Sequence, residues 1–103
     1  MRRFSARELD AYLQRNQPRL IDVREPWEFE ICHIPGSILL PMRQVPGAID
    51  RFRDQETVVI CHHGIRSLQV VRFLEMQDVK HCINLDGGVD AWAKDVDRTM
   101  ATY

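Results

Sequence analysis

The chain has 103 residues, a formal net charge of -1 at pH 7 and an ordinary composition, with 45% hydrophobic and 28% charged residues. This balance excludes a disordered or collagen-like chain, and the near-neutral charge argues against a large surface that follows nucleic-acid phosphates. A chain of this length can bury one modest core but not two. We therefore expect residues 1–103 to form a single domain that does not bind nucleic acid.

The cysteine content and the apolar runs indicate the cellular compartment of the protein. Three cysteines, an odd and sparse number, argue against a disulfide framework and favour a reducing compartment. The basic start is not followed by the apolar stretch of a secretory signal. No apolar run approaches the roughly 20 residues that span a bilayer. We expect a soluble cytoplasmic protein that does not associate with membranes.

The first half of the chain alternates between helical and strand patterns. Ser5 and Glu8 have the spacing of a capping box, which predicts a helix that begins there and ends before Pro18. The expected elements that follow are a strand at 20–24, a helix at 26–31, a short strand at 38–40 and a weak helix over 42–53.

The second half has a clearer pattern. Residues 57–60 form a continuous β-branched run, typical of a strand that is covered on both faces. Ser67 is the expected N-cap of the next helix, because apolar side chains recur at helical spacing after it. The remaining expected elements are a strand over 79–85, a turn at 86–88 and a helix over 89–94. Strands that alternate with helices predict an α/β protein with a parallel sheet and helices on both faces.

Strand direction distinguishes the three cysteines. In a parallel α/β sheet, functional sites form beyond the carboxyl ends of the strands. Cys61 follows a predicted strand and is expected at that edge, whereas Cys32 and Cys82 precede strands. We expect these two at the opposite edge of the sheet or in the core. The same rule places Asp22, Arg24 and Asp86 at the Cys61 edge of the sheet.

The segment that begins at Cys61 has the parts of an anion-binding loop. Gly64 permits a positive φ angle, which lets successive backbone N–H groups point inward. The helix after the loop directs its positive end to the same place, and Arg66 adds a forked cationic donor. These features favour the thiolate of Cys61 and suit a nucleophilic cysteine that attacks an anionic substrate.

Two alternatives to this interpretation concern the same segment. One is an ordinary strand–turn–helix connection in which Cys61 is a small buried side chain. The other is a metal site, suggested by His62 and His63 beside the cysteine. Adjacent residues of a tight turn rarely all face one ion, and no second group of ligands is near in the sequence. We therefore expect no metal and no cofactor, with one histidine tuning the pocket and the other in solvent.

Four short motifs together resemble the rhodanese family of sulfurtransferases over nearly the whole chain. In order, they are Asp22-Val23-Arg24-Glu25 followed by Trp27, Glu28 and Phe29, then His33-Ile34-Pro35-Gly36-Ser37, the loop from Cys61 to Arg66, and Leu85-Asp86-Gly87-Gly88-Val89-Asp90-Ala91-Trp92. The resemblance implies a three-layer α/β/α fold around a mainly parallel sheet of about five strands. Cys32 is a departure, because the family usually has glycine before its His-Ile-Pro motif.

The resemblance also implies a function. The Cys61 thiolate takes the outer sulfur of thiosulfate, or of a similar small anionic donor, and passes it from a persulfide to a thiol or protein acceptor. The implied substrate-binding residues are the rest of the loop: His62, His63, Gly64, Ile65, Arg66 and Ser67. Asp22 and Arg24 are expected to support the site through hydrogen bonds. Without a second lobe, Cys61 is expected to be open to a partner protein.

Two other functions fit the same loop. A sulfur-carrier or partner-docking module accepts sulfur without significant turnover of thiosulfate. Related phosphatases and arsenate reductases of this fold use Cys-x5-Arg, one residue longer than the spacing between Cys61 and Arg66. By the same resemblance, the shorter loop favours sulfur over phosphate.

Overall fold

The computed structural model describes residues 1–103 and contains five strands and five helical segments. The strands are β1 (Arg2–Phe4), β2 (Arg19–Asp22), β3 (Ile38–Leu39), β4 (Thr57–Ile60) and β5 (Cys82–Leu85). The helices are α1 (Ala6–Leu13), α2 (Pro26–Ile31), the 3-10 helix η1 (Met42–Phe52), α3 (Ile65–Met76) and α4 (Gly88–Asp95). Helix α1 begins with the predicted capping box, in which Ser5 Oγ accepts from the Glu8 N–H and the Glu8 carboxylate accepts from the Ser5 N–H.

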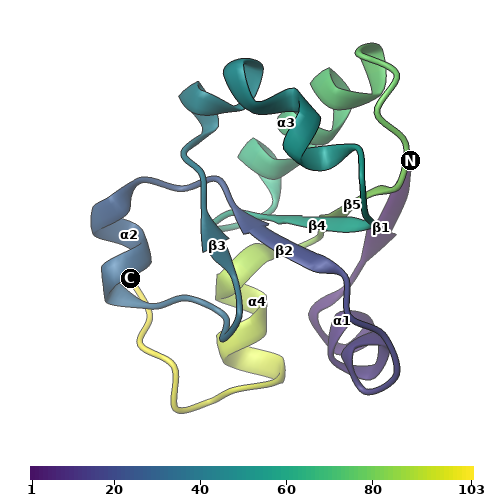
Figure 1. The fold of residues 1–103 in the computed structure, drawn as a ribbon. Helices are drawn as coiled ribbons and strands as arrows, with labels where there is room; N and C mark the ends of the chain where they lie inside the picture. The colour runs from purple at the N-terminus through teal and green to yellow at the C-terminus, as the bar shows by residue number, and fades with distance from the viewer.

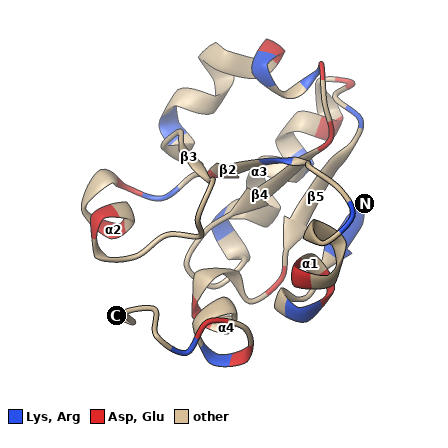
Figure 2. Ribbon diagram, turned by 60° about the horizontal axis from the view of Figure 1, so that its bottom comes forward, with Lys and Arg blue, Asp and Glu red and all other residues tan.

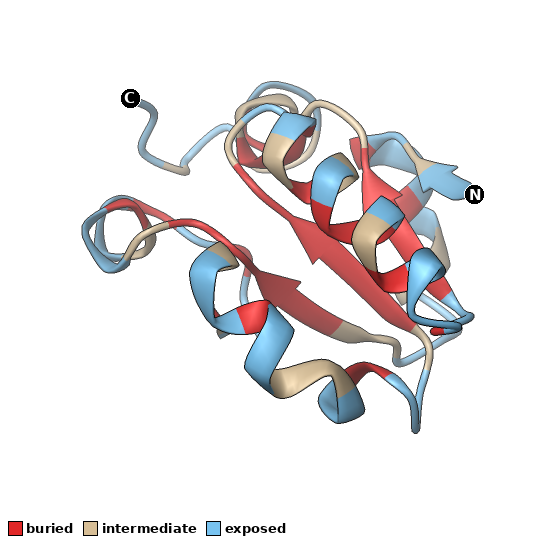
Figure 3. Cartoon of the chain, turned by 90° about the horizontal axis from the view of Figure 1, so that it is seen from above, coloured by how far each residue is buried: buried red, intermediate tan, exposed pale blue.

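All five strands are parallel and lie in the order β1-β5-β4-β2-β3. Helices α3 and η1 cover one face of the sheet, α1 and α4 cover the other, and α2 lies beyond the β3 edge beside the end of the chain (Figure 1). The predicted three-layer α/β/α fold is confirmed. Strands buried on both faces explain the continuous apolar runs of the sequence, and Figure 3 shows them buried between helices that expose their outer sides.

The two faces of the sheet have separate apolar cores. One lies under α3 and η1 and includes Phe52, Val59 and Leu74, which are all fully buried. The other lies under α1 and α4 and includes Leu9, Ile83 and Leu85, also fully buried. Because β2, β4 and β5 contribute to both cores, their carboxyl ends are held in fixed positions relative to one another.

The structure differs from the predicted elements at several points, and three of them lie in β1, in β5 and in the weak helix. Strand β1 was not expected, because Arg2 and Arg3 hide the pattern, and it exists through its pairing with β5. The strand predicted over 79–85 begins only at Cys82, since Asp78 and His81 have positive φ angles that interrupt an extended chain. The weak helix is a 3-10 helix with a kink at Ala48.

The chain carries charges of both signs, with 14 Lys and Arg and 15 Asp and Glu residues. Basic and acidic segments are interspersed over the ribbon rather than gathered on one side (Figure 2). None of the helices combines the length and the apolar character needed to cross a bilayer.

Candidate functional site

Strand β4 ends directly before Cys61, whose sulfur lies at the base of the loop that leads to α3. The Gly64 N–H donates to the Cys61 Sγ across 3.0 Å, and the thiol donates to the Ser67 Oγ across 3.3 Å. A backbone N–H that points at sulfur stabilises a thiolate, the form that acts as a nucleophile. The residue is only 1% exposed, so the expectation of an openly accessible Cys61 is wrong: its own loop curls over it.

Gly64 makes the tight turn of this loop possible. Its φ angle is +94°, as the sequence predicted, and a Cβ at this position would lie 2.9 Å from the Gly87 backbone nitrogen. Gly64 also takes the N-cap position of α3, so the prediction of Ser67 as the cap is wrong. Ser67 lies inside the first turn of the helix, where its hydroxyl accepts from the thiol instead of capping the backbone. The positive end of α3 thus begins immediately beside the sulfur.

The start of α4 holds the other side of the loop. The Val89 N–H donates to the Cys61 carbonyl across 2.9 Å, and the Asp90 N–H donates to the His62 carbonyl across 3.1 Å. Gly88 immediately precedes Val89, and a Cβ at Gly88 would come within 2.3 Å of the Cys61 carbonyl oxygen. The two carbonyls therefore point toward α4, while the Gly64 N–H points toward the sulfur.

Arg66 is paired with a buried carboxylate that the sequence analysis did not single out. Its guanidinium donates to both oxygens of Glu28 at 2.8 and 2.9 Å, and the Glu28 side chain is only 5% exposed. The pairing lowers the pKa of Glu28 to about 2, against the effect of burial. Arg66 also lines an open hollow together with Val23, Glu25, Met42 and Arg43. Glu28 thus fixes the guanidinium of the loop in one orientation next to a solvent-filled space.

Asp22 and Arg24 form a fully buried ion pair at the end of β2. The Arg24 guanidinium donates to both Asp22 oxygens, at 2.7 to 3.1 Å, and to the Tyr103 hydroxyl at 2.8 Å. Tyr103 in turn donates to Glu28 across 2.9 Å. A series of hydrogen bonds therefore runs from Asp22 and Arg24 through Tyr103 to Glu28. The Glu28 carboxylate in turn holds Arg66.

The two other cysteines lie away from the loop. Cys32 is in the core beneath α1 and α4, where its carbonyl accepts from Arg24 across 2.7 Å. The sequence predicted that Cys32 lies either at the opposite edge of the sheet or in the core, and the structure places it in the core. Cys82 opens β5 at the opposite edge of the sheet, and burial raises the pKa of its thiol to about 11. Cys82 is therefore a protonated thiol at neutral pH.

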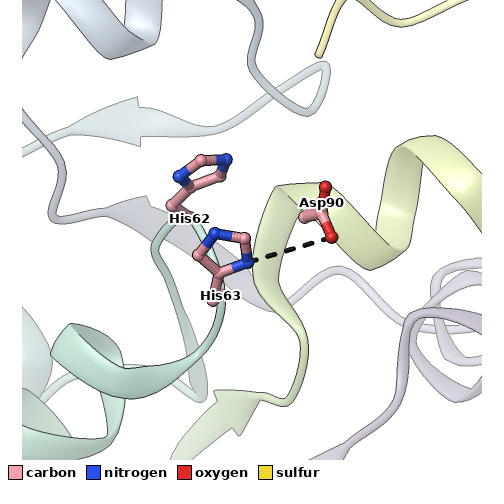
Figure 4. A group of neighbouring side chains, drawn as sticks. All are labelled: His62, His63 and Asp90. Atoms are coloured by element: carbon pink, nitrogen blue, oxygen red, sulfur yellow. Dashed lines mark ion pairs between the residues drawn. The ribbon is translucent and has the colours of Figure 1, made fainter. Parts of the chain in front are cut away.

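The two loop histidines differ in their surroundings. His62 is stacked between His63 and Tyr103, with ring centroids 3.9 and 3.8 Å away, whereas the His63 side chain is 56% exposed. Burial, followed by the charge of His63, lowers the pKa of His62, so its ring is neutral at pH 7. Figure 4 shows Asp90 of α4 facing His63, with 3.8 Å between the carboxylate and Nδ1.

The structure brings most of the predicted residues to one edge of the sheet. Gly64 and Ser67 hydrogen-bond to the Cys61 sulfur, while Ile65 is the first residue of α3 and is 68% exposed. The sequence analysis missed the roles of other residues at this edge, namely Glu28, Gly88, Asp90 and Tyr103. Glu28 and Asp90 each lie in the first turn of a helix that follows the end of a strand, and this position could have marked them as candidate site residues. Nothing in the sequence pattern marked Tyr103.

The fold and the loop define an α/β protein with a cysteine at the carboxyl edge of an all-parallel sheet. Residues 5–95 match the family model for the rhodanese-like domain. Rhodanese-like/PpiC domain-containing protein 12 of Arabidopsis thaliana is 38% identical over 93 residues, which are 85% of this chain and 31% of that protein. Thiosulfate sulfurtransferase GlpE of Vibrio cholerae is 29% identical over 83 residues, 80% of this chain and 78% of that protein.

A solved structure is similar over the same extent. The rhodanese-like domain protein of Staphylococcus aureus superposes with a TM-score of 0.82 at 31% identity, over 89% of this chain and 91% of that one. The chain spans less than a third of the first curated relatives that it matches. The chain belongs to the rhodanese-like sulfurtransferase family, and it is similar to single-domain members such as GlpE.

Proposed function

We propose that this protein is a sulfurtransferase that moves a sulfane sulfur from thiosulfate, or a similar small anionic donor, to a thiophilic acceptor through a Cys61 persulfide. One observation carries the proposal: the Cys61 sulfur accepts a backbone N–H from Gly64 at 3.0 Å, at the positive end of α3. A donor named in a relative, thiosulfate, supports the choice of substrate. Residues 1–103 act as one catalytic unit, in the cytoplasm, where the three free cysteines stay reduced.

The first half of the reaction loads the cysteine. The Cys61 thiolate attacks the outer sulfur of thiosulfate and forms a new S–S bond. The bond between the two sulfur atoms of thiosulfate breaks, and its electron pair leaves with sulfite. The terminal sulfur of the persulfide carries the negative charge, which the Gly64 N–H and the start of α3 stabilise.

The second half of the reaction unloads the cysteine. A nucleophilic acceptor, such as a thiolate or cyanide, attacks the outer sulfur of the persulfide. The S–S bond to Cys61 breaks, and its electron pair restores the thiolate. No external oxidant or reductant enters the cycle, because the sulfane sulfur is transferred at a constant oxidation state.

The remaining loop residues bind and position the donor. Arg66 attracts the anionic end of the donor, and its pairing with Glu28 holds the guanidinium beside the open hollow. Because the carboxylate offsets part of the Arg66 charge, the backbone N–H groups of the loop share in capture of the donor. Ser67 accepts from the resting thiol, and His62 lines the loop as a neutral ring stacked on His63. Asp22 and Arg24 support the site from beneath.

The experiment that tests this proposal measures thiocyanate formation from thiosulfate and cyanide. The wild-type chain and the Cys32→Ser and Cys82→Ser variants are expected to be active, whereas Cys61→Ser is expected to be inactive. Activity that survives Cys61→Ser would exclude the mechanism. A Cys61 persulfide without thiocyanate formation would instead identify a sulfur carrier. Cys61-dependent hydrolysis of p-nitrophenyl phosphate without thiocyanate formation would identify a phosphatase.

A further inference from the structure

Three side chains beside the candidate site form a group of metal-type ligands from two elements. His62 and His63 lie in the loop after β4, and Asp90 lies in the first turn of α4 (Figure 4). One donor atom from each lies within 4.8 Å of the other two, and His63 Nδ1 is 3.8 Å from Asp90 Oδ2. Adjacency of the histidines alone did not predict such a group, because the third ligand is remote in sequence.

The backbone beneath these side chains is already held in place. The Asp90 N–H donates to the His62 carbonyl across 3.1 Å, and the Val89 N–H donates to the Cys61 carbonyl across 2.9 Å. Gly88 approaches the same two carbonyls so closely that a Cβ there would clash with both, so the loop and the start of α4 are tightly packed at this point. A ligand that bridges the loop and α4 therefore costs little backbone ordering.

The side chains differ in their freedom to adjust. The His62 ring is confined by stacking against Tyr103 on one side and His63 on the other. The His63 and Asp90 side chains are 56% and 23% exposed, so both can rotate toward a common point. Ligands at about 2.0–2.2 Å from a tetrahedral ion lie roughly 3.5 Å from one another, which is a short adjustment from the present spacing.

We propose that His62, His63 and Asp90 form a binding site for one divalent transition-metal ion of the Zn²⁺ type at the mouth of the Cys61 loop. Two imidazoles and one carboxylate are a donor set that suits zinc, and water completes the fourth position. Magnesium and calcium are excluded, since they prefer an all-oxygen shell. The proposal extends the proposed function, because an ion bound to the loop hinders the approach of a donor or acceptor to Cys61.

One neighbouring cation competes for this site. Lys94 Nζ lies 2.9 Å from the Asp90 Oδ2, and the lysine side chain is 68% exposed. Such exposed pairs are weak, so zinc can displace the ammonium. Removal of the lysine is therefore expected to strengthen zinc binding by roughly two- to fivefold.

The test measures Zn²⁺ binding by titration calorimetry on the full chain that carries Cys61→Ser. This background removes the loop thiolate as a competing zinc ligand and abolishes sulfur transfer, so the result does not depend on the proposed function. One Zn²⁺ per chain is expected to bind. Asp90→Asn and His63→Gln are expected to weaken the affinity about tenfold or more, because each removes a ligand. His33→Gln, an exposed histidine elsewhere, is the matched control and is expected to leave the affinity unchanged.

Two further measurements sharpen the test. Lys94→Gln is expected to tighten binding, and the visible absorption of added Co²⁺ is expected to report nitrogen and oxygen ligation that Asp90→Asn weakens. In the Cys61-containing chain, Zn²⁺ is expected to inhibit sulfur transfer, and Asp90→Asn is expected to require more zinc for the same inhibition. Absence of saturable Zn²⁺ binding, or an affinity that Asp90→Asn leaves unchanged, would overturn the proposal.

Discussion

Replacement of Glu28 by glutamine removes the charge that holds Arg66 while keeping the shape of the side chain. In the structure this carboxylate accepts from Arg66 twice, from Tyr103 and from the Glu25 N–H. The fall of its pKa from 4.5 to about 2 corresponds to about 3 kcal/mol of stability at pH 7. Arg66 is 36% exposed, so solvent screens the pair, and glutamine keeps part of the hydrogen bonding. We expect Glu28→Gln to lower the free energy of unfolding by about 2 kcal/mol, which corresponds to a fall in Tm of roughly 10 °C.

The pH dependence of this loss identifies its cause. Because the pKa of Glu28 is lower in the folded chain, its contribution is complete above the ordinary value of 4.5 and disappears as the pH falls toward 2. By this linkage about three quarters of the contribution remains at pH 4 and less than half at pH 3. Urea unfolding of wild type and Glu28→Gln at pH 7, 4 and 3 measures the difference directly.

A matched control lies on the same helix. Glu30 is exposed on α2, and Glu30→Gln is expected to change stability by less than about 0.5 kcal/mol at each pH. The reasoning is refuted if Glu28→Gln costs no more than this control at pH 7. It is also refuted if the difference between wild type and Glu28→Gln stays the same down to pH 3.

Three other substitutions test the packing and charge around the loop. Gly88→Ala places a Cβ within 2.3 Å of the Cys61 carbonyl oxygen, at a residue with a positive φ angle. We expect thermal unfolding to show that this variant loses about 2 kcal/mol or more of its free energy of unfolding. Gly47→Ala is the control, because its Cβ meets open space, and this variant is expected to be neutral. Arg66→Ala is expected to raise the KM for thiosulfate more than it lowers kcat; unchanged steady-state kinetics would mean that Arg66 does not contact the donor. Tyr103→Phe removes a hydroxyl that joins Arg24 to Glu28 and is expected to cost about 1 kcal/mol in urea unfolding, so a neutral effect would exclude a role for that hydrogen bond.

The sequence was informative where local chemistry decides the structure. The β-branched run at 57–60, the capping box at Ser5 and the position of Cys61 after a strand each predicted what the structure has. The parallel sheet and its helical layers followed from the alternation of strands and helices. Gly64 was recognised as a positive-φ position for the same reason, since the loop must turn sharply between β4 and α3.

The features that the sequence did not reveal depend on contacts between distant residues. Strand β1 is stabilised by β5 and has no pattern of its own. Ser67 matched the preference for an N-cap, but the turn at Gly64 starts the helix three residues earlier, and the hydroxyl faces the thiol. The pairing of Glu28 with Arg66 joins residues 38 positions apart, and Tyr103 reaches the same carboxylate from the end of the chain. Such contacts join α2 to α3 and to Tyr103, and no local pattern contains them.

The central claim is that Cys61 alone receives a sulfur atom from an anionic donor. Intact mass spectrometry of the protein after exposure to thiosulfate, with excess donor removed, tests this claim most directly. We predict that wild type, Cys32→Ser and Cys82→Ser each gain the mass of one sulfur atom, which cyanide removes, and that Cys61→Ser gains none. A sulfur adduct that persists in Cys61→Ser, or its absence from wild type with every sulfane donor tried, would contradict the account.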